Sequence, residues 1–184
     1  VAEPAVEKAV MLAPLFKFLD DHNIPHMLFV NKMDTSSARV REVVEALQSV
    51  SQRPLVLRQV PIRENDQITG YVDLVSERAY AYKEGQPSDI VQIPPDMMDR
   101  EKAARTELLE ALADFDDKLL EQLLEDVIPP TPEIYYQLRT DLRKDLIVPV
   151  FLGVAQENAG VHRLWKALRH EGPEASETAQ RLGI

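Results

Sequence analysis

The chain of 184 residues contains no cysteine and only six glycines. The lack of cysteine excludes disulfides and thiolate metal sites. The glycines stand at positions 70, 85, 153, 160, 172 and 183, and no two of them are five positions apart. A G-x-x-x-x-G-K-[ST] phosphate-binding loop is therefore impossible in this chain. No glycine has an aspartate three positions before it either, so an Asp-x-x-Gly element beside a γ-phosphate is also absent.

Basic residues and long apolar runs are scarce as well. The 21 Lys and Arg against 31 Asp and Glu give a net charge of −10, which argues against a broad nucleic-acid-binding face but not against docking to a basic protein. No apolar run is long enough to cross a membrane, and the start "VAEPAVEKAV" lacks the basic region of a secretory signal. We therefore expect a cytoplasmic protein without membrane association. Because the chain opens on Val1, we expect a processed protein or a piece of a larger one.

The first part of the chain alternates helical and strand patterns. Residues 4–22 predict an amphipathic helix that Pro14 kinks or splits. The run "IPHMLFV" that follows is continuously apolar, which is typical of a strand buried on both faces of a sheet. The stretch "SSARVREVVEALQSV" then has its valines and leucine at helical spacing. This order predicts an α/β fold.

The same pattern returns near the end. The apolar run "LIVPVFLG" at 146–153 predicts a second buried strand, and a helix follows from about 160 to 170 with Trp165 expected in the core. The segment between the two strands is different, because it alternates like antiparallel strands near 55–62, 67–75 and 78–83 and then turns helical. We therefore expect three parts: a split α/β region over 1–54 and 145–173, an inserted α+β subdomain over 55–144, and a loose tail over 174–184.

The stretch "FVNKMDTSS", residues 29–37, passes from the first buried strand into a polar loop. One interpretation is an ordinary strand-to-helix turn. The other is a binding site, because open α/β sheets bind ligands beyond the carboxyl ends of their strands. The Asp34 carboxylate could accept two N–H bonds from the edge of a guanine, the Asn31 amide could reach the base or tie loops together, and the Lys32 stem could lie along the ring. The loop "GVAQENAG" after the second strand would bring the Ala155 N–H to the guanine carbonyl.

Four blocks in order resemble the GTPase domain of translation elongation factor G: "FVNKMD", "VPIRENDQITGYVDLVSERAYAY", "ARTELLEALADFDDKLLEQLLED" and "IVPVFLGVAQENAGVHRLWKAL". The resemblance implies a partial P-loop GTPase (Rossmann-like) domain with an inserted α+β subdomain. It makes Asn31, Lys32 and Asp34 guanine-specificity residues, and Gly153, Val154 and Ala155 the second guanine loop. GTP or GDP would be the ligand, with Mg²⁺ in the parent protein and its ligands outside this chain.

The chain departs from the family at two positions of the predicted site. Val154 stands where the family usually has a serine whose hydroxyl helps to hold the guanine-binding aspartate, and Thr35 stands where an arginine is usual. We expect guanine preference with lower affinity, in a divergent member of the family.

Two functional hypotheses follow. The first is a piece of a translational GTPase that hydrolyses GTP on the ribosome, in which this chain supplies guanine specificity and a docking insertion but is inactive alone. The second is a divergent, non-hydrolysing binding or regulatory module. The resemblance implies the ribosome, the remainder of the GTPase domain and the ribosomal stalk protein as partners, the last through the acidic stretch 99–126, although a solvated face explains those acids as well. A bare edge on the first buried strand predicts self-association.

Overall fold

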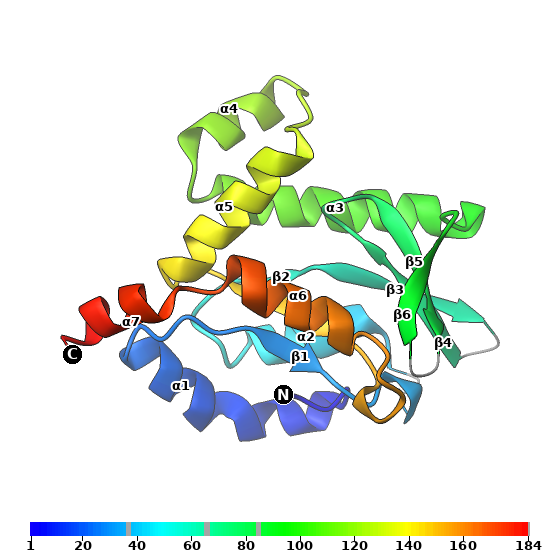
Figure 1. Cartoon of the computed structure of the whole chain (residues 1–184), viewed down its shortest axis with the longest axis horizontal. Coiled ribbons are helices and arrows are strands. Elements are labelled where there is room, and N and C mark those ends of the chain that lie inside the picture. Colours follow the sequence, from blue (N-terminus) through cyan, green and yellow to red (C-terminus); the bar gives the residue numbers. More distant parts are fainter. Residues whose placement is uncertain (36–37, 65–66, 84–85, 184) are drawn as a thin grey trace.

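The computed structural model describes residues 1–35, 38–64, 67–83 and 86–183, and its centre is a three-stranded parallel sheet (Figure 1). The strands are β1 (Leu28–Val30), β7 (Val148–Leu152) and β2 (Leu55–Leu57), in the order β1-β7-β2. Both apolar runs that were predicted to be strands, before residue 31 and before residue 153, therefore pair side by side. Their carboxyl ends meet at one edge of the sheet.

Both faces of this sheet are covered, as the continuous apolar runs predicted. Successive side chains of a strand point to opposite faces, so Leu28 and Val30 pack on one side with Phe16, while Phe29 packs on the other side with Phe151 and Ala167. Ala167 belongs to α6 (Val161–Glu171), which lies across the front of the sheet in Figure 1.

The helices on the opposite face are short. Residues 6–21 form the 3-10 helix η1 (Val6–Leu12) followed by α1 (Ala13–Asp21). The segment is split as predicted, and Pro14 lies in the first turn of α1. The helical spacing of residues 4–22 predicts Val10 and Phe16 on one buried apolar stripe, which is only partly right, because Phe16 is buried whereas Val10 is 65% exposed. A 3-10 helix has three residues per turn, so η1 turns different side chains inward. The next helix is α2 (Val40–Gln48), where the core-facing residues include Val43 and Leu47.

A four-stranded antiparallel sheet follows in the order β3-β4-β5-β6. Its strands are β3 (Gln59–Glu64), β4 (Gln67–Asp73), β5 (Arg78–Lys83) and β6 (Gln86–Val91). The predicted single strand over 55–62 is wrong, because its first half pairs with β7 in the parallel sheet and only its second half enters the antiparallel one. Strand β2 consequently serves two cores: Val56 packs into the core of the insertion, and Leu55 and Leu57 pack into that of the parallel sheet.

Helices complete the insertion. They are η3 (Pro95–Met97), α3 (Met98–Ala113), α4 (Asp117–Leu124) and α5 (Thr131–Arg143). Helix α3 runs beside β2 and β3, and α5 reaches α6 (Figure 1). Asp116 caps α4 by accepting the Leu119 N–H at 2.8 Å, so this carboxylate has a structural role at a helix junction.

Two further expectations are wrong. The predicted loose tail contains α7 (Ala175–Leu182), which begins with a capping box in which Glu174 and Glu177 satisfy each other's backbone N–H groups. Trp165 was expected in the core but is 66% exposed. Helical spacing shows which residues share a face, and here the sheet covers the face that carries Ala167.

The outer edge of β1 carries a short parallel bridge from the start of the chain. The Ala2 N–H donates to the Phe29 carbonyl, and the Asn31 N–H donates to the Ala2 carbonyl, both at 2.9 Å. Self-association through this edge stays a prediction. None of the helices in the described part of the chain has both the length and the apolar character needed to span a membrane.

Candidate functional site

The two polar loops predicted to form a site lie against each other at the carboxyl ends of β1 and β7. The Gly153 N–H donates to the Val30 carbonyl at 3.0 Å, and the Met33 N–H donates back to the Gly153 carbonyl at 3.3 Å. These reciprocal bonds extend the pairing of the two strands past their ends. The first loop, which includes η2 (Met33–Thr35), is therefore held beside the second, which includes η4 (Ala155–Glu157).

A side chain also joins the loops. The Asn31 amide oxygen accepts the backbone N–H of Ala155 at 2.8 Å. The sequence predicted that Asn31 could tie neighbouring loops together, and the structure has that bond. The same sequence analysis assigned the Ala155 N–H to a guanine carbonyl, so a base that enters here must share this donor with Asn31 or displace it.

The backbone turns sharply at Lys32, so that the next residue, Met33, is buried and the one after it, Asp34, is exposed. Lys32 has φ of 61°, in the left-handed region that non-glycine residues rarely adopt. The turn directs Met33 into the core, where it is 1% exposed, and leaves Asp34 on the surface. Thr35 closes the turn, since its hydroxyl and its N–H both donate to the Lys32 carbonyl, at 2.9 and 3.1 Å. Strained backbone of this kind is concentrated at functional sites.

Glu3 supplies the carboxylate that pairs with Lys32 in this structure. The Lys32 ammonium bonds to one Glu3 carboxylate oxygen and the Lys8 ammonium to the other. The hydrogen bond from Lys32, followed by that from Lys8, lowers the pKa of Glu3 to about 2. The side chain of Lys32 remains 56% exposed, so it can leave Glu3 for a ligand at small cost. The sequence analysis missed Glu3 because only the fold brings it beside Lys32.

The second loop is compact and depends on two glycines. Val154 and Ala159 exchange backbone hydrogen bonds of 3.0 Å each. A Cβ on Gly153 would lie 2.4 Å from the Ala159 carbonyl oxygen, and Gly160 has φ of 78°. The Val154 side chain, 4% exposed, packs in the core. It therefore offers an apolar contact where the family's serine would offer a hydroxyl to Asp34.

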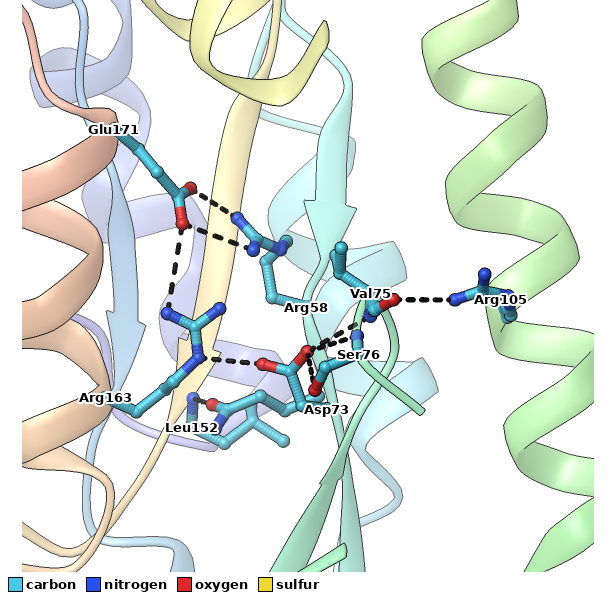
Figure 2. A network of polar contacts seen from close by, with 9 residues as sticks. Arg58, Asp73, Val75, Ser76, Arg105, Leu152, Arg163 and Glu171 are labelled. Carbon is cyan, nitrogen blue, oxygen red and sulfur yellow. Dashed lines mark hydrogen bonds and ion pairs between the residues drawn. The ribbon is translucent and has the colours of Figure 1, made fainter. Parts of the chain in front are cut away.

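A buried polar network lies behind this loop and was not predicted (Figure 2). Arg58, which is fully buried, donates to both carboxylate oxygens of Glu171 at 2.6 and 3.3 Å. Arg163 donates from Nε to Asp73 at 2.8 Å and lies 3.9 Å from Glu171 through Nη1. Both guanidinium groups also lie over the Phe151 ring, at 5.4 and 5.3 Å from its centroid.

The network connects the insertion to the helix that follows the second loop. Asp73 ends β4, Arg163 and Glu171 belong to α6, and Arg58 lies between β2 and β3. Burial raises the pKa of Asp73, but the attraction of Arg163 and Arg58 outweighs it and holds that pKa below its ordinary value. The polar character of Arg58 inside "LVLRQV" was the one sequence signal of this network.

The residues at the two loops suit the base of a nucleotide better than its phosphates. They offer the exposed carboxylate of Asp34, the amide of Asn31 and the Ala155 N–H that Asn31 accepts at 2.8 Å, and such groups recognise the edge of a base. In the part of the chain that the structure describes, no group of three or more His, Asp or Glu side chains could hold a metal ion. The placement of the Mg²⁺ ligands outside this chain stays a prediction.

The chain resembles known proteins in both sequence and fold. It matches the family described as Elongation factor Tu GTP binding domain over residues 10–174. It is 49% identical over 184 residues to the Elongation factor G-like protein of Synechocystis sp.. Over 152 residues, 82% of the chain, it is 36% identical to Elongation factor G 1 of Borreliella burgdorferi. A solved structure from Thermus thermophilus superposes on 90% of this chain with a TM-score of 0.78 and 25% identity.

The chain spans 28% and 22% of the lengths of these two relatives, and 24% of the Thermus chain. Its parallel sheet with an antiparallel insertion is the fold that the resemblance predicted. The predicted resemblance to the GTPase domain of elongation factor G is confirmed, and the chain belongs to the family of the elongation factor Tu GTP binding domain.

Proposed function

We propose that the loops after β1 and β7 form the guanine-binding part of a GTP or GDP site in a translational GTPase of the elongation factor G type. The observation that carries this proposal is the Asn31–Ala155 bond of 2.8 Å, because it brings the two loops together across 124 residues of sequence. The exposed Asp34 stands next to this joint. Family membership supports the same conclusion.

The proposed recognition depends on two N–H groups of guanine. Its ring imino and exocyclic amino groups would donate to the two oxygens of Asp34, and adenine lacks that pair of donors. Each hydrogen bond to a charged acceptor contributes about 1.5–3 kcal/mol, so this contact discriminates strongly between the purines. Lys32 would exchange Glu3 for the nucleotide and lay its methylene stem along the ring. The backbone of Gly153, Val154 and Ala155 would face the carbonyl side of the base.

Phosphate binding, hydrolysis and ribosomal action belong to the proposal for the whole protein. The chain contains neither the phosphate loop nor the Asp-x-x-Gly element, so it would select the base and leave phosphoryl transfer to other residues. The relatives from Synechocystis and Borreliella are an elongation factor G-like protein and an elongation factor G. We accordingly propose the ribosome as the partner, and docking of the ribosomal stalk protein to the acidic helices of the 55–144 insertion.

The test is a change of base specificity at Asp34. Asp34→Asn replaces one carboxylate oxygen with an amide donor, which suits xanthine because its second carbonyl stands where guanine has the amino group. We expect GDP affinity to fall by about tenfold or more and the affinity for xanthosine diphosphate to rise, measured by calorimetric titration. ADP serves as the control nucleotide. Equal GDP binding by the wild type and the variant, or equal binding of GDP and ADP by the wild type, would contradict the proposal.

A second function, a non-hydrolysing regulatory module, is favoured by one observation. Val154 is buried and apolar, so the second loop lacks the hydroxyl that would orient Asp34. Whether the gene that encodes this chain also encodes a phosphate loop separates the two functions. An intact phosphate loop there supports the GTPase, and a degraded one supports the module.

A further inference from the structure

A hollow lies beside the 153–160 loop, lined by Asn158 and Gly160 and by none of the residues of the Asn31–Ala155 joint. It has a volume of about 440 Å³, and its walls come from β4, β5, β6, the start of α5 and the first two turns of α6. Three tyrosines line it, Tyr71, Tyr80 and Tyr135, and four basic side chains line it as well, Arg78, His162, Arg163 and Lys166. This volume falls in the range of small-molecule sites.

The one carboxylate in the wall is already saturated. One oxygen of Asp73 accepts the Val75 N–H at 3.1 Å and the N–H and hydroxyl of Ser76 at 2.9 and 3.0 Å. Its other oxygen accepts Nε of Arg163 at 2.8 Å (Figure 2). The pKa of Asp73 lies below its ordinary value despite burial, which alone would raise it, because Arg163 and Arg58 stabilise the charge. The charges of Asp73 and Arg163 therefore cancel, and the net charge of the hollow is set by its remaining side chains.

Those remaining side chains are positive. Both Arg78 and Lys166 are exposed, and neither has an ion-pair partner among the described residues. The His162 ring has one hydrogen-bond partner within the same part of the chain, the Asn158 amide at 3.2 Å. Arg163, 9% exposed, has an Nη2 atom without a hydrogen-bond partner in the described residues. In a chain of net charge −10, this hollow is a local excess of unused donors and positive charge.

We propose that this hollow binds an oxyanion, the phosphate or carboxylate group of a small ligand, between Arg78 of β5 and Lys166 of α6. The two cations approach from different elements, so an anion that bridges them gains charge-assisted hydrogen bonds on two sides. The tyrosines form the walls against the non-ionic part of the ligand, with Tyr71 and Tyr80 stacked at 5.1 Å between centroids. The site is separate from the base-binding joint and does not depend on the function proposed for it.

The test is a titration of the full chain, labelled with nitrogen-15, with inorganic phosphate in one arm and malonate in the other. We expect saturable shifts of the backbone signals of 71–80 and 158–166, with half-saturation on the order of 1 mM, well within the ceiling for ligands of so few atoms. Tighter binding of phosphate assigns a phosphate-bearing ligand, and tighter binding of malonate assigns a carboxylate-bearing one. Shifts that do not saturate, or that spread evenly over the surface, overturn the proposal.

Variants make the test specific. Arg78→Gln and Lys166→Gln should each weaken binding by about tenfold, and both positions are exposed, so the fold survives the change. The matched controls are Arg139→Gln and Lys102→Gln, which remove exposed cations of α5 and α3 and should leave the affinity unchanged. If the controls weaken binding as much as Arg78→Gln and Lys166→Gln do, the effect is one of net charge and the site does not exist.

Discussion

Two sets of polar groups in this protein differ in where their hydrogen bonds go. In the network of Arg58, Asp73, Arg163 and Glu171, nearly every charge is matched by another buried charge. At the loops after β1 and β7, the charged groups Lys32 and Asp34 reach the surface. Buried groups that satisfy each other hold a fold together, whereas exposed groups on a constrained backbone are available to a ligand. Charge density alone does not separate a structural cluster from a binding site.

The largest expected effect comes from breaking the buried set. Arg58→Met leaves the buried Glu171 carboxylate with only Nη1 of Arg163, at 3.9 Å, as a charged partner. We expect the free energy of unfolding, measured by urea denaturation, to fall by about 3–5 kcal/mol. The double variant Arg58→Met with Glu171→Leu should recover most of that loss, because no uncompensated charge remains. A small effect of Arg58→Met, equal to that of Arg41→Met on the exposed face of α2, would show that the network contributes little.

Asp141 is a buried carboxylate that forms no ion pair with any described residue, which sharpens the contrast with Asp73. Asp141 accepts Gln137 at 2.9 Å, and its Oδ2 has no partner among the described residues. Burial raises its pKa from 3.8 to about 6. A raised folded-state pKa means that this group's stabilisation is fully present below pH 3.8 and is lost as the pH rises through 6.

Asp141→Asn should remove this pH dependence. Relative to the variant, the wild type should lose about 2 kcal/mol of unfolding free energy between pH 4 and pH 7, measured by denaturation at each pH. Glu125→Gln changes an exposed carboxylate and provides the control. Parallel curves for wild type and Asp141→Asn would show that Asp141 ionises as freely in the folded chain as in the unfolded one.

Val154 combines features of both sets, because its side chain is buried although it belongs to the loop of the proposed binding site. Val154→Ser should cost about 1–3 kcal/mol of stability through lost apolar contact and should raise GDP affinity a few-fold by offering a hydroxyl to Asp34. Val154→Ala loses the same contact without adding the hydroxyl. Equal GDP affinities for the serine and alanine variants would mean that the hydroxyl does not reach Asp34.

The smallest effect is expected at the exposed pair of Glu3 and Lys32. Glu3→Gln frees the ammonium of Lys32 for a nucleotide, and because exposed ion pairs are weak, GDP affinity should rise by less than about fivefold. Thermal stability should not change. A decrease in affinity would indicate that Glu3 positions Lys32 for the ligand and does not compete with it.

The sequence predicted local features better than distant contacts. The runs before Asn31 and Gly153 indicated both strands of the proposed site, because buried parallel strands are continuously apolar. Strand β6 was missed, since "QPSDIV" is an exposed edge strand with no apolar alternation. The partnership of Arg58 with Glu171 spans 113 residues, and no local pattern indicates which distant carboxylate meets a buried arginine. Trp165 was misplaced because helical spacing does not say which face the sheet covers.

The packing of β2 in two hydrophobic cores determines how the molecule unfolds. One core contains Val56, and the other contains its neighbours Leu55 and Leu57. Unfolding of the insertion therefore also removes β2 from its pairing with β7. The insertion is then not an autonomous module, and its amides and those of the parallel sheet should exchange with solvent in one cooperative unit.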